Sequence, residues 1–144
     1  MKALCVFRFE GRILVAPGYD SVKQERFFRP LGGAIEFGET AVEAIRREID
    51  EELRQDIGTP ALLGVLENRF VFDGEPGHEI LFVFDAKFGD LNLYGQASIP
   101  FAESDGSSGE AIWANPDDES FRPLYPEGLI SLLDRHGARV GSKF

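Results

Sequence analysis

The sequence has a single cysteine, few basic residues and no long hydrophobic run. Cys5 cannot form a disulfide within the chain, and its place in an apolar segment predicts a buried, inert thiol. No apolar stretch approaches the roughly 18 residues of a membrane span, and the N-terminus lacks the apolar core of a signal peptide. We therefore expect a cytoplasmic protein that has no membrane partner.

Acidic residues outnumber basic ones by 25 to 15, and the formal net charge is −10. A surface that wraps a nucleic-acid polymer needs clustered Lys and Arg, so this composition argues against such a partner. Any chemistry on phosphates would need a cation from outside the chain. The 144 residues, 43% of them apolar, show no repeat or boundary, and we expect one domain over residues 1–144.

Apolar patterns and turn-forming residues predict an α/β chain. Loops are expected over 17–25 and 102–109, and residues 27–37 should be extended chain broken by a tight turn. A turn at Glu10-Gly11 and another over 74–77 should each close a hairpin. Strands are expected over 2–9, 12–16, 61–68, 69–73, 79–88 and 111–113, and helices over 40–55 and 126–136, the latter ending before Gly137. This order predicts one α/β sandwich around a mixed sheet.

The helix over residues 40–55 is the most strongly indicated element. Thr40 and Glu43 match a capping box ahead of an apolar-periodic run. The apolar stripe that should face the core consists of Val42, Ile45, Ile49 and Leu53.

Four carboxylates are crowded into the helical segment REIDEEL, which begins at Arg47. At about 100° per residue, Glu48, Glu51 and Glu52 lie within one arc of the helix, whereas Asp50 points to the far side. Like charges at this spacing repel each other. A divalent cation, Mg²⁺ above all, would offset the repulsion, because it binds through carboxylate and carbonyl oxygens. Arg47 forms an i,i+4 pair that can steady Glu51.

An acidic helix is more often only a solvated surface, and Glu36, Glu43 and Asp50 are expected to be surface charges. The turn at Gly32-Gly33 favours a site, because it brings bare backbone close to the start of the helix. One of its carbonyls could complete the coordination of a metal ion.

The segment that begins at Gly33 closely resembles the signature box of the Nudix hydrolases, the MutT-like family. The box asks for Gly, five residues, Glu, seven residues, Arg-Glu, an aliphatic, any residue, Glu-Glu, any residue, Gly and an aliphatic. The matching positions are Gly33, Glu39, Arg47, Glu48, Ile49, Glu51 and Glu52. Arg54 and Gln55 stand in place of the final Gly and aliphatic. Since that Gly normally ends the helix, we expect the helix to run on toward Gly58.

The resemblance implies the Nudix-type α/β/α sandwich with a central mixed β-sheet. It also implies hydrolysis of a nucleoside diphosphate linked to another moiety, by a protein that is commonly a homodimer in the family. Carried over by position, the ligands of Mg²⁺ or Mn²⁺ would be Glu48, Glu51, Glu52 and the carbonyl of Gly32. Arg47 would orient a box glutamate, and Gly33 and Glu39 would support the loop–helix geometry.

Metals that bridge a diphosphate neutralise its charge, lower the pKa of a bound water and align it for in-line attack. A carboxylate then completes proton removal. In the family this base is sometimes a box glutamate and sometimes one on a distant loop. The loop candidates are Glu103, Asp105 and Glu110, and we prefer Glu110, which completes a catalytic set with Arg47, Glu48 and Glu51.

Other polar and aromatic residues have more ordinary interpretations. His78 and Glu79 are candidates for contact with a substrate phosphate or base, although polar residues at strand edges are more often structural. The phenylalanines that recur at about two-residue spacing are expected to pack in the core and on the sheet. They are Phe27, Phe28, Phe70, Phe72, Phe82 and Phe84.

Two alternatives share the fold. A non-catalytic Nudix module that binds a nucleotide would usually lose box glutamates, and this chain keeps them. A Nudix-fold isomerase of isoprenoid diphosphates would need a reactive cysteine, and Cys5 lies in a predicted core strand. Markers for ADP-ribose or dinucleoside polyphosphates are missing, because residues 70–73 hold neither Pro nor Tyr. We therefore favour a pyrophosphohydrolase of nucleoside triphosphates or related nucleotides.

Overall fold

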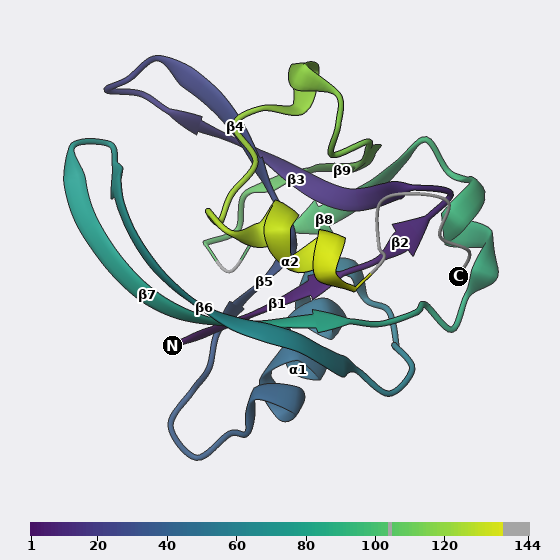
Figure 1. Cartoon of the computed structure of the whole chain (residues 1–144). Coiled ribbons are helices and arrows are strands. Elements are labelled where there is room, and N and C mark those ends of the chain that lie inside the picture. Colours follow the sequence, from purple (N-terminus) through teal and green to yellow (C-terminus); the bar gives the residue numbers. More distant parts are fainter. Residues whose placement is uncertain (104, 137–144) are drawn as a thin grey trace.

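The strands form two sheets that lie between two α-helices (Figure 1). The computed structural model describes residues 1–103 and 105–136. In the first sheet, β1 runs parallel to β7 and the other pairs are antiparallel, so the sheet is mixed. Its strand order is β5 (Leu31–Ala34), β1 (Lys2–Val6), β7 (Glu75–Asp85) and β6 (Ala61–Phe72).

The second sheet is antiparallel throughout. Its order is β2 (Arg8–Phe9), β3 (Arg12–Asp20), β9 (Ser108–Ala114) and β8 (Ser98–Ala102), and β4 (Glu25–Arg29) also pairs with β3. The single strand expected over residues 2–9 is therefore two strands in different sheets. The chain crosses from one sheet to the other at Phe7, which is fully buried, and crosses back at Pro30.

Each helix covers a different core. The first, α1 (Ala41–Leu53), packs against β5, β1 and β8 over a core that includes Cys5, Ile49 and Trp113. The second, α2 (Leu129–Arg135), packs against β6 over a core built around Val83 and Leu132. The predicted α/β/α arrangement is confirmed, with two sheets in place of one central sheet. None of the described helices is long and apolar enough to cross a bilayer.

Cys5 is fully buried, as predicted. Burial raises the pKa of its thiol well above the ordinary value. The reactive thiolate is therefore disfavoured, which agrees with the expected inert role.

Helix α1 begins as the sequence predicts. The Thr40 hydroxyl accepts from the amide of Glu43 at 3.1 Å, and the Glu43 carboxylate accepts from the amide of Thr40 at 2.9 Å. The prediction that Val42 belongs to the apolar stripe facing the core is wrong, because Val42 is 38% exposed. Ala44 is buried instead.

The expectation that α1 runs on toward Gly58 is also wrong. The helix ends at Leu53, and Arg54 takes the left-handed conformation with φ 55° and ψ 43° that glycine adopts most easily. The amide of Arg54 still donates to the carbonyl of Asp50, at 2.8 Å. The helix therefore ends where the family has Gly, although Arg54 disfavours the left-handed conformation. We attribute this end to tertiary packing.

Two long hairpins account for most other differences. Residues 17–25 are not a loop, because β3 and β4 pair through most of this stretch; Gly18 leaves room for the ring of Phe27, which would collide with a side chain there. The strands expected over 61–68 and 69–73 are one continuous β6. Its turn to β7 is Asp73-Gly74, both with positive φ, rather than 74–77.

The C-terminal third is more regular than the sequence suggested. Strands β8 and β9 extend into the segment 102–109, and short 3₁₀ helices occupy Leu91–Gly95 and Glu119–Phe121. Helix α2 begins at Leu129 rather than near Pro126, and Gly137 lies outside the described residues. Of the phenylalanines expected to pack in the core and on the sheet, Phe28 and Phe84 are buried, whereas Phe72 is 40% exposed.

Candidate active site

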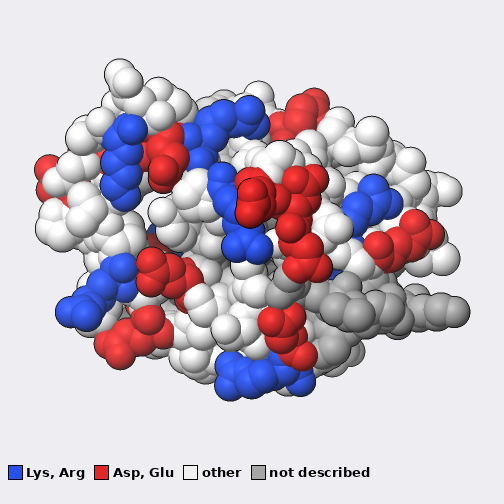
Figure 2. Space-filling model, turned by 45° about the horizontal axis from the view of Figure 1, so that its top comes forward, with Lys and Arg blue, Asp and Glu red and all other residues white. Residues whose placement is uncertain are grey.

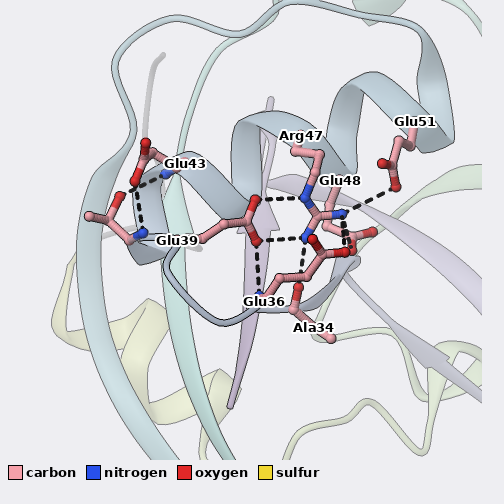
Figure 3. Close-up of polar contacts among 8 residues, drawn as sticks. Ala34, Glu36, Glu39, Glu43, Arg47, Glu48 and Glu51 are labelled. Atoms are coloured by element: carbon pink, nitrogen blue, oxygen red, sulfur yellow. Dashed lines mark hydrogen bonds and ion pairs between the residues drawn. The ribbon is translucent and has the colours of Figure 1, made fainter.

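Arg47 links the C-terminal half of α1 to the loop before the helix and to β5 (Figure 3). Its guanidinium donates to both oxygens of Glu39, at 2.7 and 2.9 Å, in a bidentate pair. It also donates to Glu48 at 3.0 Å, to Glu51 at 3.3 Å and to the carbonyl of Ala34 at 2.9 Å. One side chain thus joins the loop, the helix and β5.

The charges of this network stabilise one another. Hydrogen bonds from Arg47 lower the pKa of Glu39 to about 2, helped by the amide of Glu36. The same bonds raise the pKa of Arg47. Glu39 therefore stays ionised and holds Arg47. Glu36 is an exposed, longer-range partner of Arg47, at 3.8 Å.

The tight turn expected at Gly32-Gly33 is wrong, because both residues lie within strand β5 and pair with β1, where Gly33 is next to the Glu48 carboxylate. A Cβ at Gly33 would lie 2.5 Å from the carboxyl carbon of Glu48, so a side chain there would displace the Glu48 carboxylate. At Gly32, where φ is 151°, a Cβ would lie 2.0 Å from the carbonyl oxygen of Ala3. Burial raises the pKa of Glu48, and the contact with Arg47 opposes this shift.

Glu52 differs from its neighbours because it is buried. It is 5% exposed, and neither carboxylate oxygen has a hydrogen-bond partner among the described residues. Burial, together with repulsion from Glu103 and Glu48, raises the pKa of Glu52 to about 8, against smaller opposing effects of Arg29 and the Gly32 amide. By contrast, the Glu51 side chain is 50% exposed. The three carboxylates expected on one arc therefore lie at different depths.

Of the loop candidates, Glu103 lies closest in space to this cluster. It follows β8, which packs on α1, and its carboxylate contacts Arg29 at 3.4 Å. Glu110 is an exposed residue of β9. Its neighbour Ala111 faces the α1 core, so by strand alternation Glu110 faces the other way. Asp105 accepts bonds from Ser107 within its own turn.

His78 and Glu79 lie on β7, in the hairpin of β6 and β7. His78 contacts the carboxylate of Glu67 at 2.8 Å, and Glu79 pairs with Lys2 at 2.5 Å. His78 also lines an open cleft of about 720 Å³, shared with Phe70 and Glu127 and their neighbours. Substrate contact by His78 and Glu79 stays a prediction.

The donor set suits a hard divalent ion, although the side chains do not converge on one point. No group of three or more His, Cys, Asp or Glu within residues 1–103 and 105–136 is arranged to hold an ion as it stands. Two observations nevertheless fit an ion. Both oxygens of Glu52 are buried without a partner, and the Glu48 carboxylate lies over the bare backbone of Gly33. Carboxylate and carbonyl oxygens are the ligands that Mg²⁺ prefers.

Sequence reasoning missed Arg29. This residue and Glu103 are 74 positions apart, and they meet only because β4 and β8 belong to the same sheet. No local pattern marks such a pair. On the face drawn in Figure 2, Lys and Arg lie in separate groups beside Asp and Glu.

The comparisons with known proteins agree with this geometry. The NUDIX domain pattern matches residues 2–129. A solved MutT NUDIX hydrolase from Burkholderia pseudomallei is 25% identical with a TM-score of 0.65, over 91% of this chain and 93% of its own. A NUDIX hydrolase from Nitrosomonas europaea is 14% identical with a TM-score of 0.65, over 96% and 89%.

A solved UDP-X diphosphatase is 23% identical with a TM-score of 0.60, over 96% of this chain and 64% of its own. A comparison with curated proteins finds no match. The domain match covers most of the chain and contains every box residue described above. The chain therefore belongs to the NUDIX family of pyrophosphohydrolases, enzymes that typically use a divalent metal ion and act on nucleotide-type substrates.

Proposed function

We propose that this chain is a single-domain hydrolase that cleaves the pyrophosphate bond of a nucleoside diphosphate linked to another moiety, such as a nucleoside triphosphate, with Mg²⁺ or Mn²⁺. The observation that carries the proposal is the carboxylate of Glu52, buried near Glu48 and Glu103 without a hydrogen-bond partner among the described residues. An ionised carboxylate in such surroundings costs free energy unless it is paired or coordinates a metal.

We assign the ion to Glu48, Glu51 and Glu52 together with the carbonyl of Gly32. Glu52 supplies the buried oxygens and Glu48 lies over Gly33, while Glu51 would rotate away from its weak 3.3 Å contact with Arg47. Arg47 and Glu39 act as positioning residues. Glu39 holds the guanidinium of Arg47, and that guanidinium in turn holds the Glu48 carboxylate.

The bound ion would neutralise the diphosphate and lower the pKa of a bound water. The chain must then accept the proton of that water. We assign this role to Glu103 in preference to Glu110, because Glu103 acts electrostatically on Glu52 while Glu110 lies on the opposite face of β9. The cleft beside His78 and Phe70 is the proposed location for the nucleoside or its attached group.

A substrate panel with and without metal tests the proposal. Purified protein is incubated with nucleoside triphosphates and with nucleoside diphosphate sugars, which the likeness to a UDP-X diphosphatase recommends. Phosphate and pyrophosphate release are measured in Mg²⁺, in Mn²⁺ and in chelator. We expect turnover of at least one compound with metal and none in chelator.

A full rate in chelator would overturn the mechanism. Binding of nucleotides without turnover of any panel member would instead favour the non-catalytic nucleotide-binding module. Asp50→Asn is the matched control for the loss of one carboxylate, because Asp50 is an exposed residue of the same helix, and it should leave the rate unchanged.

A further inference from the structure

Arg29 faces the carboxylate cluster from the second sheet. It is directly paired with Ala16, which is buried in the core on the α1 side, so Arg29 shares that face of the sheet. Its guanidinium contacts the Glu103 carboxylate at 3.4 Å. Across the same space lies Glu52, near the C-terminal end of α1.

The two arginines of the site are held very differently. Arg47 makes five hydrogen bonds to three glutamates and one carbonyl, and its side chain is 24% exposed. Among residues 1–103 and 105–136, Arg29 makes one long contact, and its side chain is 37% exposed. Charge-assisted hydrogen bonds are normally about 2.7–2.9 Å, so the contact of Arg29 is weak.

A weak and partly exposed ion pair contributes little to stability, on the order of 0–1 kcal/mol. The contact of Arg29 with Glu103 therefore adds little to the free energy of folding. The position of Arg29 places a positive charge beside Glu103, whose carboxylate repels that of Glu52 on another chain segment. Glu103 itself is anchored by its amide, which donates to the carbonyl of Ser107 at 2.8 Å.

We infer that Arg29 is a positioning residue for the hydrolysis: it holds the Glu103 carboxylate beside Glu52 and supplies positive charge that limits repulsion among the carboxylates of the site. This inference rests on the proposed function. The inference assigns a role to Arg29, which lies on β4, outside the Nudix box. Arg29 acts through Glu103 and does not itself contact the reacting atoms.

The test compares Arg29→Gln with Arg29→Lys and with Arg26→Gln. Arg26 lies on the same strand, over the ring of Phe28, and gives the same change of charge away from the cluster. We expect Arg29→Gln to lower kcat about tenfold with little change in KM or Tm, because Glu103 is no longer held. Arg29→Lys should recover part of kcat, and Arg26→Gln should behave like the unmodified protein.

A double-mutant cycle separates positioning from a general structural role. If Arg29 acts through Glu103, the loss of kcat caused by Arg29→Gln should disappear in a Glu103→Gln background. An equal loss in both backgrounds, or no loss in either, would overturn the inference.

Mn²⁺ binding gives a readout that does not depend on turnover. Removing the positive charge of Arg29 should tighten Mn²⁺ binding, measured by electron paramagnetic resonance, about two- to fivefold. Unchanged or weaker binding would overturn the inference. A protein that binds Mn²⁺ but hydrolyses nothing would refute the proposed function alone, since the Mn²⁺ comparison still tests Arg29. Normal turnover and binding in Arg29→Gln would refute this inference alone.

Discussion

The carboxylates of α1 and of the loop before it form two regions, which differ in how the negative charges are compensated. Around Arg47, Glu39 and Glu48 are paired by hydrogen bonds of 2.7–3.0 Å, so this region is satisfied by the protein itself. Around Glu52, two carboxylate oxygens are buried without a partner among the described residues. Glu48 in the first region and Glu52 in the second are separated by little more than one turn of α1.

The difference supports the proposal that the region around Glu52, rather than the region around Arg47, receives the metal ion. A paired network holds its shape with or without a bound ion and suits a positioning role. A buried carboxylate without a partner remains costly until a proton or a cation arrives. We therefore expect substitutions around Arg47 to affect stability and activity together, and substitutions at Glu52 to affect activity far more than stability.

The largest expected effect is on the rate of Glu52→Gln. Removing the buried charged ligand should lower kcat about 10³-fold, measured as phosphate release at saturating Mg²⁺. The fold should survive, because Gln has nearly the same shape and no charge to bury. An unimpaired rate in Glu52→Gln would remove the proposed site.

The next largest effect is expected for Arg47→Ala. Loss of its hydrogen bonds should lower the free energy of unfolding by about 2 kcal/mol and kcat about ten- to a hundredfold, because Glu48 and Glu51 lose their orientation. Denaturant unfolding and steady-state kinetics measure the two effects. Arg46→Ala, which removes one bond to the carbonyl of Ile57, should leave kcat unchanged. A stable Arg47→Ala would mean that the paired region does not support the fold.

A smaller effect is expected in the pH dependence of stability in chelator. The pKa of Glu52 is raised from its ordinary 4.5 to about 8 in the folded state. The folded state thus keeps a proton that the unfolded state releases, so the stabilisation is complete below about pH 4.5 and is lost as the pH rises toward 8. Tm should fall by several degrees over this range, as measured by circular dichroism.

Two comparisons sharpen that pH experiment. Glu52→Gln should show a smaller fall in Tm, because it has no proton to lose. Saturating Mg²⁺ should also reduce the fall, since the ion replaces the proton as the partner of the carboxylate. Identical profiles for Glu52→Gln and the unmodified protein in chelator would contradict the buried, unpaired state.

The smallest effect is expected at the helix end that follows Glu52. Arg54→Gly should raise the free energy of unfolding by about 0.5–1 kcal/mol, because relief of the left-handed conformation exceeds the added freedom of the unfolded chain. Arg54→Ala keeps the Cβ and should give no such gain. Neither variant should change kcat, and a large change would mean that the helix end rather than Glu52 controls the rate.

Local patterns predicted the part of the candidate site that lies within one helix and its N-terminal cap. The capping box of Thr40 and Glu43 and the pairing of Arg47 with Glu51 depend on residues three or four positions apart, so their spacing is visible in the sequence. The close approach of bare backbone to the helix was also expected at this position, and Gly33 lies next to the Glu48 carboxylate.

Features that depend on distant segments were not predictable in this way. Arg54 ends α1 against its own preference, so tertiary packing overrides the local signal. Asp73-Gly74 closes the long hairpin where a four-residue turn was expected, because β6 and β7 keep pairing out to Phe72 and Glu75. Register of this kind is set by the partner strand.

By itself, the sequence determined the position of α1, its N-terminal cap and the spacing of the carboxylates, because these follow from the 3.6-residue period of a helix. The tertiary structure alone decided that Glu52 is buried while Glu51 is exposed, and that Arg29 meets Glu103 from another strand. Burial and such pairings depend on contacts with segments that are far away in the chain. The spacing of neighbouring residues therefore does not predict them.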